Sequence, residues 1–458
     1  MLDIRLVRES PEKVRENLRH RGMPEKISEL DRLLQLDADW RREQAEADRL
    51  RKRRNEITQS IAAARKKGQD VSPLLKEAEA IPDQIKTIES RVDNYKQQAD
   101  QILLGLPNLA HESVPVGKNE DDNVEMKKWG TIPNFHFKPF DHIDLGLRKG
   151  LIDVEKAGQV AGARFYYLRD DLVRLNIALI HYGLDFIAGK GFQLFQPPYL
   201  LHRNVIAGAV ALADFEDVIY KVEGEDLHLL ATAEHALLAF HMDEIIDGAK
   251  LPLHYAAVSP CFRKEAGAHG RDTKGIFRVH QFEKVEQFIY SRPEDSWTLH
   301  EELLRNLEEF WESLNMPYRI VNVCTGDLGT VAAKKYDLEA WLPGQGKYRE
   351  MASCSNCTGY QAVRSRIRYR EKPNEPTKYL HSLNSTLVAT ERAIVAILEN
   401  YQKPEGTIQI PEVLRKYMGG QETIPLPRVV TLSHTGTVQK THQTSSALNL
   451  KKSNRSTN

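Results

Sequence analysis

The sequence predicts a long helical hairpin, then a larger domain of mixed helices and strands, then a polar tail. Three observations predict this order. Apolar residues recur at steps of three and four between residues 33 and 102, which is the helical period. Short apolar runs set between longer helical stretches fill residues 142–417. From about residue 421, Ser, Thr, Asn and Lys replace large apolar residues, a composition typical of disorder.

The hairpin is predicted from two apolar stripes of helical spacing. The turn between them contains Lys67-Gly68-Gln69-Asp70 and Ser72-Pro73, so we expect two antiparallel helices packed as a coiled coil. The first stripe spans about thirty residues and, at about 1.5 Å per residue, would project about 45 Å. The stripes are Leu33, Leu36, Trp40, Ala47, Leu50, Ile57, Ile61 and Ala64, and Leu74, Ala78, Ile81, Ile85, Ile88, Val92, Tyr95, Ala99 and Ile102.

Charge is balanced over the whole chain, with 64 basic and 64 acidic residues, but it is uneven along the hairpin. Between Arg41 and Asp70 there are ten basic residues and five acidic ones, a local excess of +5. A long basic arm favours an extended anionic partner such as a nucleic acid. An oligomerisation element or a spacer is the alternative interpretation of the hairpin.

The segment between Phe262 and Glu286 carries the strongest chemical signal. If it forms two strands joined by a glycine-containing loop, alternation gathers two arginines, acidic residues and one aromatic ring on a single face. Arginines bind phosphate oxygens, a ring stacks on a base, and carboxylates hold an amine, a hydroxyl or a metal ion. A solvated face with interstrand ion pairs is the alternative. The residues are Cys261, Arg263 and Glu265 on the first strand, and Arg278, His280, Phe282, Lys284 and Glu286 on the second.

Several classes of protein are disfavoured by the sequence. We find no glycine-rich dinucleotide fingerprint and no P-loop. No run resembles a signal peptide or is long enough to span a bilayer, and four cysteines form no disulfide framework, so a soluble cytoplasmic protein is expected. Cys354 and Cys357 have the spacing of half a zinc site, but Cys261 and Cys324 are isolated, so no zinc is expected.

The chain resembles the class II aminoacyl-tRNA synthetases and, within them, the seryl-tRNA synthetases, from Met1 to about Gly420. The stretch from Gly191 to Tyr199 resembles motif 1 of the class, Phe262-Arg263-Lys264-Glu265 through Phe282 resembles motif 2, and Leu383-Asn384-Ser385-Thr386 through Arg392 resembles motif 3. Thr232-Ala233-Glu234 resembles the family's triplet for recognising serine. The hairpin matches the arm that the family lays on tRNA.

The resemblance implies an α+β class II catalytic domain, with an antiparallel sheet flanked by helices, preceded by the coiled-coil arm. It implies a tRNA-binding domain over residues 1–110 and a catalytic domain over 111–420, leaving 421–458 as the disordered tail. It also implies a homodimer that activates L-serine with ATP and Mg²⁺ and transfers it to tRNA(Ser), and possible use of tRNA(Sec) is left open.

The resemblance assigns roles to individual residues. Arg263 and Arg392 would be catalytic, because they would meet the charge that develops on the phosphates of ATP. Phe282 would stack on adenine with Arg392 on the other face of the base, and Glu265 would accept its amino group. The expected ATP-binding residues are Arg263, Lys264, Glu265, Arg278, Val279, Phe282, Glu350, Met351, Ala352, Ser353 and Arg392, of which Glu350 and Ser353 would also hold the metal.

The remaining expected site residues bind the amino acid and the tRNA. Glu286 and Thr386 would pair with the serine hydroxyl, and Thr232 and Glu234 would lie near its ammonium and carboxylate. The serine-binding residues are Thr232, Ala233, Glu234, Arg263, Glu286, Asn384 and Thr386, and the tRNA-binding residues are Arg51, Arg53, Arg54, Arg271 and Lys274.

Two other functions fit parts of the sequence. A ligase that hands its amino acid to a carrier protein would be expected to lose the arm, which this chain retains. A non-catalytic tRNA-binding relative would be expected to carry damage at Arg263, Glu286, Glu350 or Arg392, and all four are present.

Overall fold

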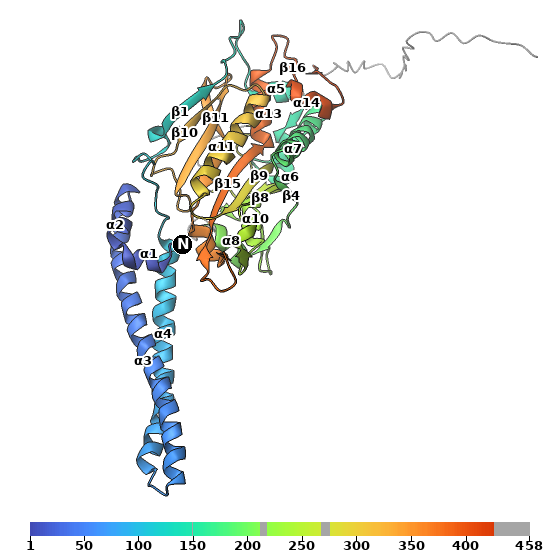
Figure 1. Cartoon of the computed structure of the whole chain (residues 1–458). Coiled ribbons are helices and arrows are strands. Elements are labelled where there is room, and N and C mark those ends of the chain that lie inside the picture. The colour runs from blue at the N-terminus through green and yellow to red at the C-terminus, as the bar shows by residue number, and fades with distance from the viewer. Residues whose placement is uncertain (149, 211–217, 267–274, 426–458) are drawn as a thin grey trace, which may run out of the picture.

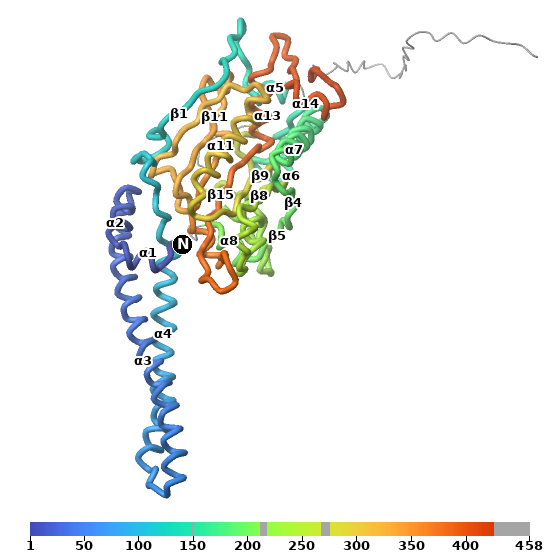
Figure 2. Tube along the Cα trace, in the orientation of Figure 1, coloured from blue at the N-terminus to red at the C-terminus, as the bar shows by residue number. Residues whose placement is uncertain are grey.

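The computed structural model describes residues 1–148, 150–210, 218–266 and 275–425. It consists of a body built on one large sheet and a long arm that projects from it (Figure 1). The same trace in Figure 2 shows that the chain enters the body only after it has run out along one arm helix and back along the other.

The arm is an antiparallel pair of helices, α3 (Ile27–Lys66) and α4 (Ser72–Gly105). Forty residues in α3 correspond to about 60 Å at 1.5 Å per residue, so the arm is longer than the predicted 45 Å. The extra length comes from the start of α3, where Leu30 and Leu33 pack against the short helices α1 (Ile4–Glu9) and α2 (Pro11–His20). Farther out, Leu50, Ile57 and Ile85 belong to a separate apolar seam between α3 and α4.

The body is organised around an eight-stranded sheet with the order β1-β10-β11-β12-β15-β9-β8-β4. All neighbouring strands are antiparallel except β4 and β8, which confirms the mostly antiparallel sheet expected of the fold class. The strands are β1 (Val124–Trp129), β4 (Gln193–Phe195), β8 (Leu253–Phe262), β9 (Gln281–Ser291), β10 (Tyr318–Asn322), β11 (Lys334–Leu342), β12 (Lys347–Asn356) and β15 (His381–Ala389).

Helices cover both faces of this sheet (Figure 1). On β9, Val285 and Ile289 point into the main core, which includes residues of α7 (Asp171–Gly189), α11 (Ser296–Ser313) and α13 (Thr390–Asn400). Phe288 and Tyr290 point the other way into a smaller core. Residues of α8 (Arg203–Ala209), α10 (Ala233–Ala239) and α12 (Tyr360–Ser365) complete that smaller core.

The remaining elements are short and connect or edge the body. The helices are α5 (His142–Arg148), α6 (Val154–Ala161), α14 (Glu412–Arg415), η1 (Pro24–Lys26), η2 (Glu120–Asp122), η3 (Gly248–Lys250) and η4 (Lys416–Met418). The strands are β2 (Ile152–Asp153), β3 (Tyr167–Leu168), β5 (Leu200–His202), β6 (Leu227–Leu229), β7 (Ile245–Asp247), β13 (Arg368–Arg370), β14 (Lys378–Tyr379), β16 (Ile408–Gln409) and β17 (Thr423–Ile424).

The predicted start of the disordered tail at residue 421 is too early. Gln421 donates through its side-chain amide to Asp171 Oδ2 at 2.9 Å, and β17 pairs with β16. Ile424 is fully buried in the main core, which explains why this segment stays attached. Residues 426–458 lie outside the described part of the chain.

One helix, α7, is long and apolar enough by length and composition to cross a membrane, which the sequence analysis did not anticipate. In the fold, its residues Leu172, Leu175 and Leu179 are fully buried in the main core. The apolar character of α7 is therefore used in packing against the sheet.

Candidate active site

The two strands predicted around the motif-2 loop are shorter than expected. β8 ends at Phe262 and β9 begins at Gln281, so Arg263, Glu265, Arg278 and His280 lie in the connecting segment. The ladder continues by one bond, from the Arg263 backbone N–H to His280 O at 3.0 Å. Glu265 has φ +51°, which is incompatible with a strand, and its carboxylate pairs with Arg278 at 3.2 Å.

A polar stripe crosses the middle of the sheet on the face that carries the smaller core. In the strand register Thr386 is opposite Glu286, and Asp337 is opposite Ser353. Directly opposed residues in an antiparallel pair point to the same face, so four strands contribute to one polar surface. The stripe comprises Asp337, Glu339, Glu350, Ser353, Ser355, Asn384, Thr386, Glu286 and Lys284.

Glu350 and Ser353 share this surface because of a β-bulge. Residues three apart on a regular strand point to opposite faces. Here Glu350 pairs with Glu339 and Ser353 pairs with Asp337, so Met351 is an extra residue between them. Met351 turns into the main core, only 1% exposed, and the two proposed metal ligands are left on the same side.

A cavity of about 340 Å³ lies over one part of the stripe. Its lining includes Thr232, Glu234, Arg263, Ser353 and Asn384, which places most of the residues expected to bind serine together. We call it the smaller cavity.

Two buried charges lie beside the smaller cavity. Lys284 Nζ is 2.5 Å from Glu286 Oε2 and donates to Thr232 Oγ1 at 2.7 Å. Thr386 Oγ1 donates to the same Glu286 oxygen at 3.3 Å. The sequence analysis placed Lys284 on the predicted strand face but gave it no role. Its position between Phe282 and Glu286 at the strand period of two was the pattern that could have assigned it to the site.

Glu234 is held in the smaller cavity by two amide groups. Its Oε1 accepts from Gln361 Nε2 at 2.6 Å and from Asn384 Nδ2 at 3.1 Å. Burial, reinforced by the nearby charge of Glu286, raises the pKa of Glu234 to about 7. The carboxyl group is therefore poised to ionise when a cation enters the cavity. Gln361 lies outside the family motifs and was missed from the sequence.

A second cavity, of about 760 Å³, opens between the turn of β11 and β12 and the segment after the motif-2 loop. We call it the larger cavity. Its lining includes Phe277, Arg278, Arg349, Glu350 and Arg392. Arg278, Glu350 and Arg392 were expected to bind ATP. Phe277 and Arg349 were not singled out by the sequence analysis.

Charges in the larger cavity are coupled. Arg392 Nη1 donates to Glu350 O at 3.0 Å and lies 3.4 Å from Glu350 Oε1. Burial alone would raise the pKa of Glu350, but the positive charges of Arg392, Lys335 and Arg263 hold it below its usual value. Arg263 lines the smaller cavity, and its charge also acts on the Glu350 carboxylate of the larger one.

Two phenylalanine rings contact arginines at the site, while the sandwich of adenine between Phe282 and Arg392 stays a prediction. The Arg392 guanidinium lies 5.2 Å from the ring of Phe277, and Arg349 lies 4.2 Å from the same ring. Phe282 is instead contacted by Arg263 at 5.4 Å and is only 7% exposed. Phe277, which the sequence analysis did not single out, therefore lies beside Arg392.

Some expected site residues do not point side chains into either cavity. Ala233, Val279, Met351 and Ala352 are between 0% and 2% exposed, so these residues are covered by the surrounding structure. Lys264 is fixed through its backbone N–H to Val218 O at 2.9 Å. Arg271 and Lys274 lie outside the described residues.

The arm arginines are more neutralised than their sequence excess indicates. Arg53 pairs with Glu77 at 2.8 Å across the hairpin, and Arg51 pairs with Glu89 at 2.7 Å. Arg54 is exposed and makes no ion pair within the described part of the chain. Of the three arm residues expected to bind tRNA, Arg54 thus presents the least compensated charge.

Two histidines, His235 and His280, lie near the site, and the ring of His280 has structural partners. Nδ1 of His280 lies 2.8 Å from Arg263 O and 3.1 Å from the Tyr220 hydroxyl. Burial, with the charges of Arg263 and Lys284, lowers the pKa of His235 to about 3. His235 therefore supports the site as a neutral, buried group.

Two family models match the chain. One, described as the seryl-tRNA synthetase N-terminal domain, matches residues 1–110. The other, described as the class II tRNA synthetase core domain for glycine, histidine, proline, serine and threonine, matches residues 218–401. The first match covers the arm, and the second covers most of the residues that line the two cavities.

Similar proteins span nearly all of the chain. It is 52% identical to a serine–tRNA ligase of Nitrosopumilus maritimus over 424 residues, which is 93% of this chain and all of the relative. A Pyrococcus horikoshii seryl-tRNA synthetase solved with ATP is 51% identical, with a TM-score of 0.90 over 93% of this chain and 100% of that one. A Naegleria fowleri serine–tRNA ligase solved with AMP is 37% identical, with a TM-score of 0.84 over 93% and 99%.

Proposed function

Because the chain belongs to the seryl-tRNA synthetase family, we propose that its smaller cavity binds serine and its larger cavity binds ATP. The enzyme activates serine with ATP and transfers it to tRNA. The observation that carries the assignment of the cavities is the position of Arg263, which lines the smaller cavity and acts on Glu350 in the larger. A serine carboxylate beside Arg263 would face the phosphates of a nucleotide held by Arg392.

In the activation step, the serine carboxylate attacks the α-phosphorus of ATP and pyrophosphate leaves. Arg263 stabilises the charge that develops at the α-phosphate, and Arg392 binds the phosphates that depart. Both side chains are positioned in advance, because Arg263 Nε donates to Ala231 O and Arg392 to Glu350 O. Phe277 or Phe282 supplies the ring surface for adenine, and opening of the Phe277–Arg392 contact would admit the base.

Serine is recognised through its hydroxyl and its ammonium group. Glu286 and Thr386 are in hydrogen-bond contact with one another, and a serine hydroxyl inserted beside them finds both an acceptor and a donor. Glu234 pairs with the ammonium, with Thr232 beside it. Alanine is rejected because it would leave these buried polar groups unpaired.

The residues around Glu350 fit a Mg²⁺ ion that reaches the site with ATP. Glu350, Ser353 and Asp337 offer only oxygen ligands, and Asp337 Oδ1 is buried without a hydrogen-bond partner. The described residues contain no cluster of three or more metal-binding side chains, as expected for an ion that keeps waters and substrate phosphates as ligands. When bound, the ion would neutralise phosphate charge. Glu350 and Ser353 would hold it.

The arm carries the tRNA contact in this proposal, with Arg54 and its neighbours Arg51 and Arg53 facing phosphates. The substrate is tRNA(Ser), and charging of tRNA(Sec) by the same enzyme is the second possibility. The presence of the arm disfavours a carrier-protein ligase. We place the enzyme in the cytoplasm, in agreement with its four free thiols.

We also propose a homodimer formed through motif 1. β4 is the edge strand of the sheet, and apolar side chains are exposed on it and around it. Leu194 is 44% exposed, Leu200 44% and Ile177 48%. Leu194→Asp should convert the dimer to a monomer in analytical ultracentrifugation, and an unchanged sedimentation coefficient would reject this interface.

Serine-dependent exchange of pyrophosphate into ATP tests the active-site assignment. We expect exchange with serine and not with alanine, glycine or cysteine, and its loss in Arg263→Ala. A folded protein that binds tRNA but exchanges with no amino acid would support the non-catalytic alternative. Transfer of the activated serine to a purified carrier protein instead of tRNA would support the ligase alternative.

A further inference from the structure

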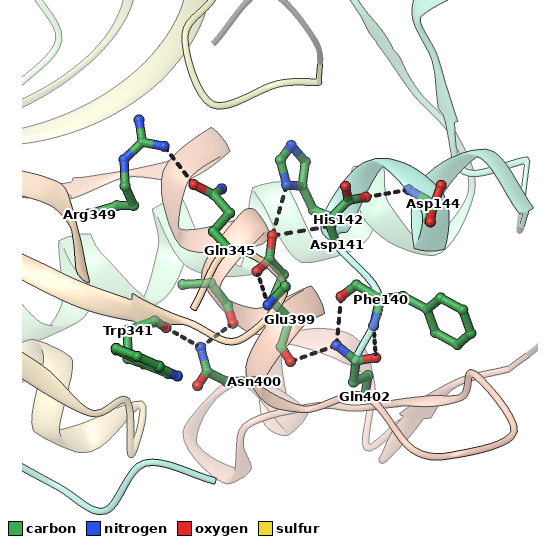
Figure 3. Close-up of polar contacts among 12 residues, drawn as sticks. Phe140, Asp141, His142, Asp144, Trp341, Gln345, Arg349, Glu399, Asn400 and Gln402 are labelled. Carbon is green, nitrogen blue, oxygen red and sulfur yellow. Dashed lines mark hydrogen bonds and ion pairs between the residues drawn. The ribbon is translucent and has the colours of Figure 1, made fainter. Parts of the chain in front are cut away.

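A buried carboxylate at the far end of α13 connects the two walls of the larger cavity. Glu399 is fully buried and lies seven residues after Arg392 on α13, about 10 Å farther along the helix axis. It accepts three hydrogen bonds, as Figure 3 shows: from His142 N at 3.2 Å, from the His142 ring at 3.0 Å and from Gly344 N at 2.9 Å. All three partners are donors, so the carboxylate is satisfied only by this arrangement.

The first connection leads to the turn between β11 and β12. Gly344 begins that turn, and the next residue, Gln345, accepts from Arg349 Nη1 at 2.6 Å (Figure 3). Arg349 in turn lies against Phe277 in the larger cavity. Glu399 thereby fixes the turn that orients Arg349.

The second connection leads to the segment that follows the motif-2 loop. The carboxylate can only accept, so the ring hydrogen of His142 lies on Nδ1. Nε2, on the other side of the ring, is buried without a hydrogen-bond partner and lies against Gly275. A methyl group on Gly275 would overlap this nitrogen. The ring therefore acts as a stop that sets how closely Gly275, and with it Phe277, approaches the body.

We propose that Glu399 and His142 are positioning residues for ATP, which hold Arg349 and Phe277 at their places in the larger cavity. Neither residue lines that cavity or the smaller one, so they act through the turn and through Gly275. The inference rests on the assignment of the larger cavity to ATP. It predicts a selective effect on the nucleotide, because the contacts given above lead from Glu399 and His142 to Arg349 and Phe277 in the larger cavity.

The variant Glu399→Gln tests the proposal in the full-length enzyme. In this variant an amide N–H group, which is a donor, replaces one accepting oxygen of the carboxylate. It would face another donor, so either the turn or His142 must move. We expect KM for ATP to rise about tenfold in pyrophosphate exchange, with KM for serine within twofold of wild type. The variant Asn306→Ala is the matched control, because Asn306 is 4% exposed and bonds to Gln287 away from both cavities. It should lose stability without a change in either KM.

A double-mutant cycle separates positioning from loss of folding. Gly275→Ala should raise KM for ATP severalfold in the wild-type background and less in His142→Ala, because removal of the ring relieves the closest overlap and leaves only the one with the side chain of Ile143. The backbone strain at Gly275, with φ +84°, is common to both backgrounds and cancels. His142→Asn, which keeps a donor to Glu399, should lie closer to wild type than His142→Ala does.

Three outcomes would overturn the inference: an unchanged KM for ATP in Glu399→Gln, an equal rise in both KM values, or an additive cycle. If Glu399→Gln does not fold, the cycle alone decides. A wild-type enzyme that shows no serine-dependent exchange would instead reject the proposed function, and that result is obtained before any variant is made.

Discussion

Lys284 and Glu286 form a buried ion pair, with 2.5 Å between Lys284 Nζ and Glu286 Oε2 and with side chains 6% and 2% exposed. The two residues lie two apart on β9 and therefore point to the same face of the sheet. The ammonium also donates to Thr232, which caps α10. The pair thus joins β9, which carries Glu286, to the helix that carries Glu234.

Breaking this pair should destabilise the protein. Lys284→Met leaves the Glu286 carboxylate buried without its counter-ion, and such losses cost about 3–5 kcal/mol. We expect a clear fall in the urea concentration at the unfolding midpoint, with exchange activity lost as Glu286 shifts. Lys127→Met, which removes an exposed partner of Glu308, is the control and should change stability by less than about 1 kcal/mol. Equal effects of the two variants would contradict the proposed importance of the buried pair.

Arg263 should be required for chemistry more than for binding of ATP. Arg263→Ala removes a charge aimed at the α-phosphate, so kcat for serine-dependent exchange should fall about 10²–10³-fold. Arg263→Lys keeps the charge but not the planar guanidinium group, so its kcat should be only slightly higher than that of Arg263→Ala. Single-turnover formation of seryl-adenylate measures the step directly. A variant that changes only KM for ATP would move Arg263 from catalysis to simple binding.

Serine affinity should depend on the ionisation of Glu234. Its pKa, raised to about 7, means that the free enzyme carries a neutral carboxyl group at lower pH, whereas the serine ammonium needs the carboxylate. KM for serine should therefore rise up to about tenfold per pH unit below pH 7 and level off above it. In Glu234→Gln this dependence should disappear. A flat profile in the wild type would show that Glu234 does not pair with the ammonium.

The same pKa affects folding stability in the opposite direction. Between about pH 4.5 and 7 the unfolded chain has released the Glu234 proton while the native protein retains it. The contribution of this residue to stability therefore decreases as pH rises through that window. The free energy of unfolding of the wild type minus that of Glu234→Gln, measured with urea, should be smaller at pH 7.5 than at pH 5. A difference that grows with pH would contradict this expectation.

The arm should bind tRNA through the charges that it leaves uncompensated. Arg54→Ala should raise KM for tRNA about fivefold and reduce its salt dependence, because it removes a free counter-charge for phosphate. Arg53→Ala should have a smaller effect, since Arg53 is already paired with Glu77. Aminoacylation at several salt concentrations measures both quantities. A larger effect at Arg53 than at Arg54 would mean that the pair with Glu77 opens on tRNA.

The sequence by itself determined the helical arm, and through its resemblance to a known family the antiparallel class II body and several charged and polar residues around the two cavities. The arm follows from apolar spacing, which is a local property of the chain, and Arg263, Glu234 and Glu286 are recognisable from motifs that are short and contiguous. These features need no knowledge of distant contacts.

Only the tertiary structure decided how those residues meet. The bulge at Met351 places Glu350 and Ser353 on one face, whereas strand alternation separates them. Glu77 and Glu89 neutralise arm arginines from the opposite helix, and Phe277, which the sequence analysis did not single out, lies beside Arg392. Each of these features depends on strand register or on residues far apart in sequence, so a local sequence pattern does not predict it.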